Sequence, residues 1–320
     1  PEMAMAIYKH AIVFDNQSDS YQLVCPDSQR ECLEQFINSK LSQLTDKRTS
    51  SFELMTPWQA NISKQAYQEK FNKIQDYLLS GDCYQINLTQ RFSSHYRGDE
   101  FKAYLKLREQ NEAPFSAFIR LPQHVILSIS PERFLLLDNN KVQSKPIKGT
   151  MVRSSDPIQD KKNATMLCHS LKDQAENLMI VDLLRNDISR VCLPGTVKVP
   201  KLFDIESFPA VHHLVSTVEG ELDKEFNACD LLRAAFPGGS ITGAPKIRAM
   251  EIIDELEPQR RSIYCGSIGY VSACGNMDTS ITIRTLVCEH NQIHCWAGGG
   301  IVADSEVDAE YQESLDKVNK

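Results

Sequence analysis

The sequence predicts a mixed α+β fold, and three observations lead to that prediction. Strand-like alternation occurs at 83–96 and in the segments around 115–137, and strands dominate again from 266 to 300. Helical patterns are irregularly spaced; they lie at 63–80, 160–188, 245–257 and from about Ser305 to the end. The regular strand–helix alternation of a doubly wound parallel sheet is therefore missing. A hydrophobic content of 42% and a charged content of 24% are those of a globular protein.

The first 56 residues are predicted to form a separate segment. Two strand-like stretches precede a helical pattern around residue 30, and a polar tract at 38–57 is the best candidate for a linker. The chain starts at Pro1 without an initiator methionine, so we expect a trimmed protein. In this interpretation 1–56 is the remnant of an N-terminal subdomain with its linker, and 57–320 is the main domain.

Elements of the main domain have local signals. Ser63 precedes apolar residues at helical spacing and Gly81 follows them, which predicts a capped helix. Pro245 suits the first turn of a later helix. Strand signals occur, in order, as a hairpin within 115–137 and at 196–202, 211–221, 267–273, 277–289 and 292–300.

Charge and cysteine usage exclude several classes of protein. A net charge of −7 without a cluster of lysines and arginines argues against nucleic-acid binding. The longest apolar runs are too short to span a bilayer. None of the ten cysteines forms a CxxC pair or falls at zinc-finger spacing. We therefore expect reduced thiols in a cytoplasmic protein.

Lys148 is the most informative candidate residue. Pro146 and Gly149 bracket it on a tight bend, where one residue restricts φ and the other permits unusual values. A surface lysine in a turn is the commonest explanation for such a pattern. A lysine aimed at a pocket, where it acts as a nucleophile, is the functional alternative.

Carboxylates gather on the last helix. Glu306, Glu310, Glu313 and Lys317 share one face at helical spacing. A solvated charged face is the ordinary explanation. The alternative is a Mg²⁺ site, with Glu176 on the helix at 160–188 as a further ligand, because Mg²⁺ is bound through few carboxylates plus waters and substrate oxygens.

Two glycine-rich loops and three isolated polar residues complete the candidates. The loop at 238–246 departs from the nucleotide-binding pattern but offers backbone N–H groups to an anion, as does 298–300; each could equally be a tight turn. Arg284 lies in an apolar strand-like segment and suits carboxylate recognition. His213 is by default a core or surface histidine, and Glu132 could donate a proton if its pKa is raised.

Taken together, these segments resemble the chorismate-utilising enzyme family, in order from about residue 57 to the end. The resemblance is carried by CYQINLTQRF (83–92), SPERF (130–134), PIKGT (146–150), AENLMIVDLLRNDI (175–188), FPAVHHLVST (208–217), AFPGGSITGAPK (235–246), GSIGY (266–270), MDTSITIRT (277–285), AGGGIVADS (297–305) and AEYQE (309–313). It implies a two-layer antiparallel β-sandwich flanked by helices, truncated at its N-terminus.

The resemblance also implies roles for individual residues. Glu176 and Glu313 would bind Mg²⁺, with Glu310 in a supporting position, and the ion would hold the ring carboxylate of chorismate. Glu132 would be the general acid that helps to expel the C4 hydroxyl. The remaining implied substrate contacts are Arg284, Gly299 and Gly300 for the enolpyruvyl carboxylate, Thr242, Gly243 and Lys317 for carboxylate binding, and His213 beside the reacting face.

Two positions separate the branches of the family. Isochorismate and salicylate synthases have a water-activating lysine where this chain has Gln85, so an amine nucleophile is favoured here. Anthranilate synthases have alanine at the position of Lys148. In the branch with lysine, the amine is thought to attack C2 as the C4 hydroxyl leaves, and ammonia then adds at C4 and expels the lysine. The product would be 4-amino-4-deoxychorismate, with ammonia from a separate glutamine amidotransferase subunit.

Two alternatives stay open. The chain could be an anthranilate synthase component I, which would release pyruvate from the same substrate. It could also be a non-catalytic truncated module that serves binding or assembly. Product mass separates the first alternative, and thermal stabilisation by chorismate with Mg²⁺ tests the second.

Overall fold

The computed structural model describes residues 3–43 and 51–319 and divides into two compact units, 1–50 and 51–320. The sequence placed its boundary six residues later. The short strand β3 (Glu53–Leu54) pairs with Arg97 and Tyr96, so it belongs to the larger unit. Part of the predicted linker, 44–50, lies outside the described residues.

The smaller unit contains a hairpin and a helix. Strands β1 (Ala11–Asp15) and β2 (Ser20–Val24) are antiparallel, and the 3₁₀ turn Asp27–Gln29 leads into α1 (Arg30–Ser42). None of its described residues is buried. The unit therefore has the predicted local structure without a core of its own.

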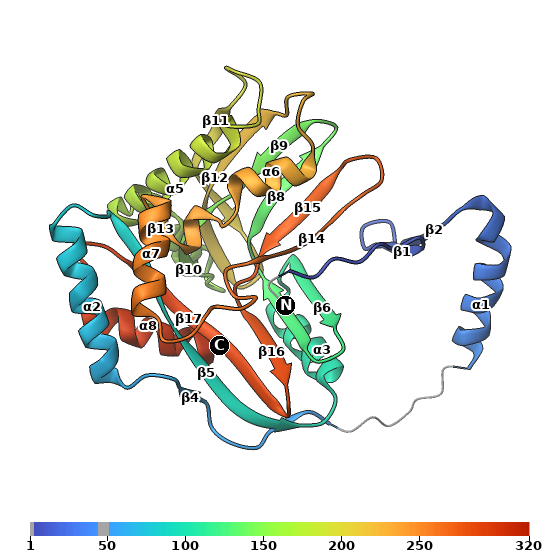
Figure 1. Cartoon of the computed structure of the whole chain (residues 1–320), viewed down its shortest axis with the longest axis horizontal. Coiled ribbons are helices and arrows are strands. Elements are labelled where there is room, and N and C mark those ends of the chain that lie inside the picture. Colours follow the sequence, from blue (N-terminus) through green and yellow to red (C-terminus); the bar gives the residue numbers. More distant parts are fainter. Residues whose placement is uncertain (1–2, 44–50, 320) are drawn as a thin grey trace. The chain divides into compact units, whose positions relative to one another are not determined.

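The larger unit is built on two antiparallel sheets flanked by helices, which confirms the predicted fold class (Figure 1). The seven-stranded sheet contains β8 (Arg133–Asp138), β9 (Lys141–Ser144), β10 (Ile147–Val152), β11 (Lys198–Ser207), β12 (Val211–Glu221), β14 (Ser267–Val271) and β15 (Met277–Ile281). The eight-stranded sheet contains β3, β4 (Gln59–Ala60), β5 (Gln85–Arg97), β6 (Phe115–Arg120), β7 (Val125–Ser130), β13 (Gly243–Ala244), β16 (Thr285–Glu289) and β17 (Gln292–Ile301).

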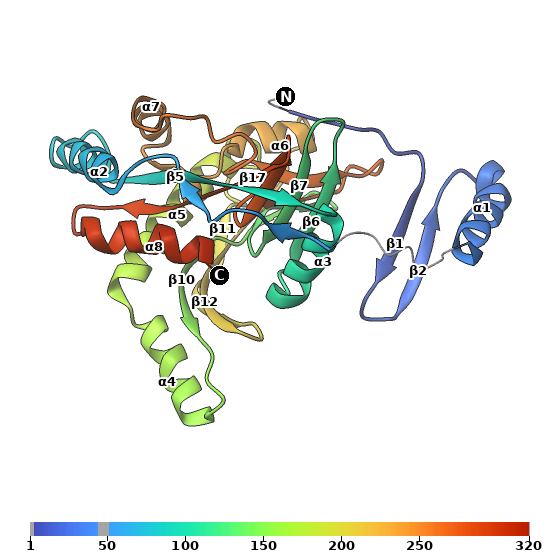
Figure 2. The ribbon, with the colours of Figure 1, turned by 90° about the horizontal axis from the view of Figure 1, so that it is seen from below.

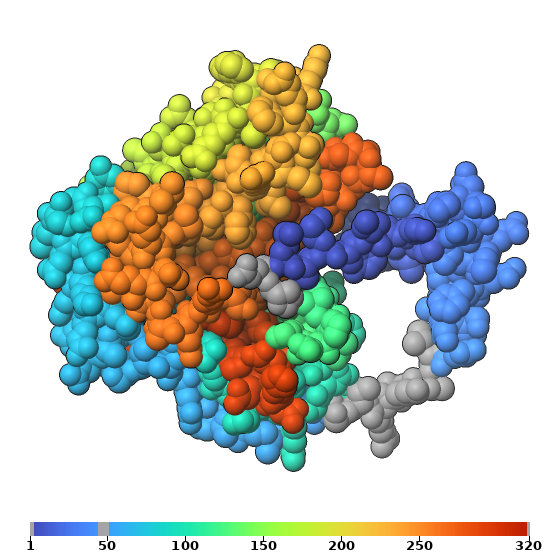
Figure 3. Space-filling model, in the orientation of Figure 1, coloured from blue at the N-terminus to red at the C-terminus, as the bar shows by residue number. Residues whose placement is uncertain are grey.

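Helices of the larger unit pack on both sheets. They are α2 (Lys64–Leu79), α3 (Glu100–Asn111), α4 (Pro157–Cys168), α5 (Leu171–Ser189), α6 (Ala228–Ala235), α7 (Lys246–Leu256) and α8 (Val307–Asn319). Ser63 caps α2 by accepting a bond from the amide of Ala66, as the sequence predicts. Helices α2 and α7 adjoin on one face of the molecule (Figure 3), and Tyr67 and Ile252 share one apolar cluster beneath them.

The largest apolar cluster joins the two sheets. Phe134 on β8, Val218 on β12 and Ile281 on β15 come from one sheet, while Val287 and Trp296 come from the other. Helices α5 and α6 contribute apolar side chains to the same cluster. Burial of this shared core is what holds the sheets together.

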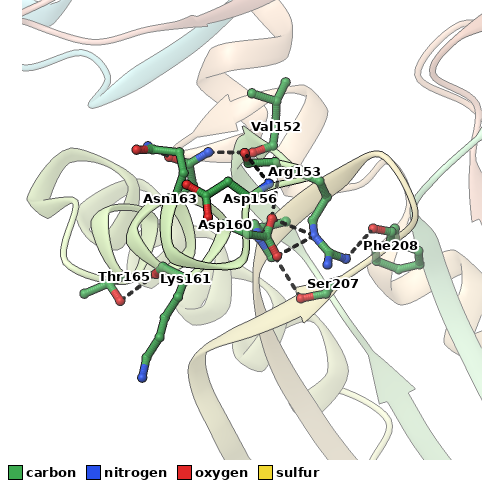
Figure 4. Close-up of polar contacts among 12 residues, drawn as sticks. Val152, Arg153, Asp156, Asp160, Lys161, Asn163, Thr165, Ser207 and Phe208 are labelled. Carbon is green, nitrogen blue, oxygen red and sulfur yellow. Dashed lines mark hydrogen bonds and ion pairs between the residues drawn. The ribbon is translucent and has the colours of Figure 1, made fainter.

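The predicted helix over 160–188 is two helices, which corrects the sequence interpretation. Ser170 begins α5 by accepting a bond from the amide of Asp173, and such a cap favours a helix start over continuation. Helix α4 then extends from the body beside β10 and β12 (Figure 2). Asp160 fixes it there by accepting bonds from Arg153 and the amide of Ser154 (Figure 4). His212 Nε2 lies 3.0 Å from the same carboxylate.

The predicted strand over 277–289 is also divided. Strand β15 ends at Ile281 in one sheet, and β16 begins at Thr285 in the other. Arg284 lies between them with φ of 48°, so it is not a residue of a strand interior as predicted. A side chain in the left-handed region is unfavourable unless its surroundings hold it, and such positions cluster at functional sites.

All ten cysteines are free thiols. Among the described residues, no helix has both the length and the apolar character needed to cross a membrane.

Candidate active site

Glu132 and Arg284 lie at two neighbouring crossovers between the sheets. The chain passes from β7 to β8 at Glu132, and from β15 to β16 at Arg284. Backbone bonds tie the crossovers together, since Ile281 N donates to Glu132 O at 3.1 Å and Ile129 N donates to Arg284 O at 3.0 Å. Two polar residues far apart in sequence are thereby placed in one region.

Lys148 lies on an irregular part of β10 rather than on a free bend. The register of β10 against β12 shifts between Ile147 and Thr150, which places Lys148 and Gly149 in a bulge. Gly149 has φ of 83°, and a Cβ there would lie 2.8 Å from Asp173 Cγ, so only glycine fits without strain. The bulge directs Lys148 inward, where its side chain is only 14% exposed.

The Lys148 amine is near two acceptors. Its Nζ lies 3.7 Å from Glu176 Oε2 on α5 and 3.4 Å from the carbonyl oxygen of Ser240. The sequence analysis interpreted Lys148 as a nucleophile and Glu176 as a metal ligand. Both contacts are long for hydrogen bonds, so the amine is held in place only loosely.

Glu132 is a buried acid with a raised pKa. Burial raises the pKa of its carboxyl to about 7, against the opposing effects of Lys148 and of a hydrogen bond from Ser240. Ser240 Oγ donates to Glu132 Oε1 at 3.2 Å. A carboxyl group in this state can act as a proton donor near neutral pH, which is the role that the sequence assigned to it.

Ser240 is the residue that sequence reasoning missed. Its hydroxyl binds Glu132 and its carbonyl faces Lys148, so one residue connects the amine and the acid. We call Lys148, Glu176, Ser240 and Glu132 the amine–acid cluster. Ser240 belongs to the glycine-rich loop that the sequence singled out, where Thr242 and Gly243 were chosen instead. The sequence feature that could have identified Ser240 is a polar side chain directly after two glycines.

His213 and Arg284 adjoin this cluster. His213 Nδ1 lies 2.9 Å from Thr150 Oγ1, two residues beyond Lys148. Burial, together with the positive charge of Arg284, lowers the pKa of His213, so the ring favours its neutral form. Arg284 is exposed, and no carboxylate of the described residues pairs with it. A guanidinium without an acidic partner suits a substrate carboxylate.

Gln85 lies against the second glycine-rich loop. A Cβ on Gly300 would lie 2.2 Å from Gln85 Nε2, and one on Gly243 would lie 2.1 Å from the Gln85 carbonyl. Both polar atoms of the buried Gln85 amide lack a hydrogen-bond partner. An unsatisfied buried amide is costly, which is consistent with a position that a ligand completes. The hydroxyl of Thr242 instead bonds within its own loop, to Gly238 O at 2.9 Å.

Acidic residues of α8 lie over the start of the 298–300 glycines. A Cβ on Gly299 would lie 2.8 Å from Glu310 Oε2 and 3.6 Å from Glu313 Oε1. Lys317 Nζ bonds Glu313 at 2.6 Å and the Gly298 carbonyl at 2.8 Å. We call Gly298, Gly299, Glu310, Glu313 and Lys317 the α8–glycine cluster. Glu306, also on the predicted charged face, precedes the helix.

The predicted Mg²⁺ ligands come from α5 and α8. Burial raises the pKa of Glu310 most, Glu313 raises it further, and Lys172 at the start of α5 lowers it. No group of three or more His, Cys, Asp or Glu side chains is arranged for a metal within the described residues. Carboxylate oxygens are the donors that Mg²⁺ prefers, so the residue types of Glu176, Glu313 and Glu310 are compatible with the ion.

A comparison with family models matches the whole chain, residues 1–320, to the model described as chorismate binding enzyme. The chain is 58% identical over 323 residues to aminodeoxychorismate synthase component 1 of Escherichia coli (strain K12), covering 100% of this chain and 70% of that protein. It is also 58% identical over 320 residues to the protein of the same name from Klebsiella aerogenes, with the same coverage.

A solved structure is also similar. The anthranilate synthase component I of Streptococcus pneumoniae TIGR4 matches with a TM-score of 0.87 at 35% identity, over 98% of this chain and 72% of that one. The identity to this structure is lower than that to the two relatives above.

Proposed function

The chain belongs to the family of chorismate binding enzymes, and from that premise we propose that it aminates chorismate at C4 with ammonia to give 4-amino-4-deoxychorismate. The relatives named aminodeoxychorismate synthase component 1 support this, because they match the full chain at 58% identity. The observation that carries the proposal is the amine–acid cluster. It holds a nucleophilic amine and a proton donor on either side of Ser240.

The chemistry uses the two groups in sequence. The Lys148 amine, as its neutral form, adds to C2 while both conjugated ring double bonds shift and the C4–O bond breaks. Glu132 gives its proton to the departing hydroxyl, which leaves as water. Ammonia then adds at C4, both double bonds shift back, and the C2–N bond breaks, which releases Lys148 as the neutral amine. The one excess proton on the C4 nitrogen returns to the Glu132 carboxylate, so the acid is restored and no pyruvate is lost.

Further residues bind the substrate. Arg284 would pair with the enolpyruvyl carboxylate, assisted by the backbone of Gly299 and Gly300. The remaining contacts would come from Thr242, Gly243, Lys317 and Gln85, with His213 beside the reacting face. The unpaired guanidinium of Arg284 and the unsatisfied amide of Gln85 support these roles.

Mg²⁺ is the proposed cofactor. Glu176 and Glu313 would hold it, with Glu310 in a supporting role, and it would supply positive charge for the ring carboxylate. The hard oxygen donors of α5 and α8, and the raised pKa of Glu310, support a cation here.

A second protein is the proposed source of ammonia. The relatives are named component 1, which implies a component 2. We propose that this partner is a glutamine amidotransferase, as the sequence predicted.

Product mass after incubation with chorismate, ammonium and Mg²⁺ tests the proposal. We expect the mass of aminodeoxychorismate, with all of the pyruvyl carbon retained. Anthranilate with free pyruvate would overturn the proposal in favour of the anthranilate synthase alternative. Neither product, and no thermal stabilisation by chorismate with Mg²⁺, would favour the non-catalytic module. Intact mass after chorismate without ammonia should show an adduct on wild-type protein and none on Lys148→Ala.

A further inference from the structure

One edge of β5 lacks a strand partner beside the candidate site. Strand β17 pairs along one edge of β5. On the other edge, β13 pairs with Gln85 and Ile86, and β4 pairs with Phe92 and Ser93. Within 3–43 and 51–319, no strand pairs with the stretch 87–91 on that side. Unpaired backbone groups in a buried position require other partners.

Glu257 and Arg261, which follow α7, supply partners at Thr89 and Asn87. Glu257 Oε1 accepts bonds from the Thr89 amide at 2.9 Å and the Thr89 hydroxyl at 2.8 Å. The Arg261 guanidinium donates to the Asn87 carbonyl at 2.6 Å. The two side chains also form a bidentate pair, at 2.9 and 2.7 Å, and are 5% and 12% exposed. This is the strong, directional form of ion pair.

The same guanidinium also reaches the loop of the candidate site. Arg261 Nη1 donates to the Ile241 carbonyl at 2.8 Å. Ile241 lies between Ser240, which contacts Lys148 and Glu132, and Thr242, whose carbonyl accepts a bond from the Asn87 amide at 2.8 Å. Arg261 therefore bridges β5 and the loop that contains Ser240.

We propose that the Glu257–Arg261 pair is a positioning device that holds Ser240 against Lys148 and Glu132. The pair does not touch the reacting groups. It acts by fixing the carbonyl next to Ser240 to the backbone of β5, so the loop cannot move relative to the strand that carries Gln85. The expected fall in kcat rests on the proposed function, whereas the position of Ser240 relative to β5 does not depend on the reaction.

The shape of the guanidinium explains the choice of arginine. Its donors point in several fixed directions, and here they serve the carbonyls of Asn87 and Ile241 and both oxygens of Glu257. A lysine ammonium is a single compact group at the end of a flexible stem and cannot reproduce the three-way contact. Arg261→Lys therefore retains charge but loses the geometry.

The test compares Arg261→Lys and Arg261→Met with Arg248→Met in the wild-type background. Arg248 lies in the first turn of α7 and pairs with Asp82 at 3.0 Å. Among the described residues it has no hydrogen bond to the loop at 238–243. We expect kcat to fall about 100-fold in Arg261→Met and about 10-fold in Arg261→Lys. KM should change less than about threefold, because misplacing reacting groups by about 1 Å costs rate rather than binding. Arg248→Met should match wild type.

A second readout does not depend on activity. Lysines carrying ¹³C-methyl groups, introduced by reductive methylation, are followed by NMR, and Lys148→Arg identifies the Lys148 signal. In Arg261→Lys and Glu257→Gln, the Lys148 signal should move while that of Lys201, paired with Asp204 at the surface, stays in place. These milder variants keep the test valid if Arg261→Met does not fold.

The outcomes are distinct. A lower kcat at nearly constant KM with a shifted Lys148 signal supports the positioning role. An unmoved Lys148 signal in a folded Arg261 variant overturns it, as does an unchanged kcat. If wild-type protein forms no aminated product, the proposed function fails, and the Lys148 signal alone then decides the positioning role.

Discussion

The amine–acid cluster and the α8–glycine cluster differ in how completely their charges are paired. In the first, Lys148 lies 3.7 Å from Glu176 and Glu132 keeps a raised pKa in a buried position. In the second, Lys317 and Glu313 form a 2.6 Å pair, and their side chains are 46% and 52% exposed. Loosely paired, buried groups are suited to chemistry, whereas the exposed Lys317–Glu313 pair is suited to binding charge. Substitutions in the two clusters should therefore have different consequences.

Removal of the amine is expected to have the largest effect. Lys148→Ala should lower the rate of aminodeoxychorismate formation by at least about 1,000-fold, because it removes the nucleophile. Mass-detected product formation at saturating chorismate and ammonia measures this. Thermal unfolding serves as the control for folding. Activity close to wild type would show that the two clusters do not differ in the way proposed.

Removal of the acid should have the next largest effect. Glu132→Gln should lower kcat about 100-fold, since a general acid typically contributes between about 10² and 10⁴. In the wild type, kcat should fall as the pH rises through about 7, because Glu132 must carry a proton. The variant should lose this limb of the pH profile. If kcat of Glu132→Gln still falls through the same pH range, the titrating group is not Glu132.

The same acid should affect folding stability in a pH-dependent way. Its pKa is 4.5 ordinarily and about 7 when folded, so the folded state binds the proton more tightly. Stability from this group is full below about pH 4.5 and is lost as the pH rises to about 7. Relative to wild type, Glu132→Gln should be more stable at pH 8 than at pH 4 by up to about 3 kcal/mol. Denaturant unfolding at both pH values measures this, and an equal difference at both would contradict the burial of the charge.

A substitution in the α8–glycine cluster should give the smallest change in the free energy of unfolding. Lys317→Met removes an exposed pair, so the free energy of unfolding should change by less than about 0.5 kcal/mol. KM for chorismate should nevertheless rise about tenfold, because Lys317 is a proposed carboxylate contact. Steady-state kinetics and denaturant unfolding separate the two effects. A large loss of kcat without a change in KM would place Lys317 with the chemistry instead of with binding.

Several residues could be assigned from sequence because their signals are local. Ser63 caps its helix as predicted, and Gly149 has the positive φ that its place beside Lys148 suggested. Local signals have a limit at 160–188, where one predicted helix is in fact two helices. An apolar pattern continues across His169, and only the cap at Ser170 marks the break.

The sequence by itself determined the α+β class, the order of most elements and the identities of Lys148, Glu132 and Glu176 as candidates, because residue type and short-range spacing are properties of the chain alone. Only the tertiary structure decided which of them meet. Ser240 joins Lys148 to Glu132 across 92 and 108 residues, and Arg261 reaches Asn87 across 174. Such contacts depend on how the chain crosses between sheets, and no local pattern records a crossover. The strained backbone at Arg284 arises for the same reason, at the point where the chain leaves one sheet for the other.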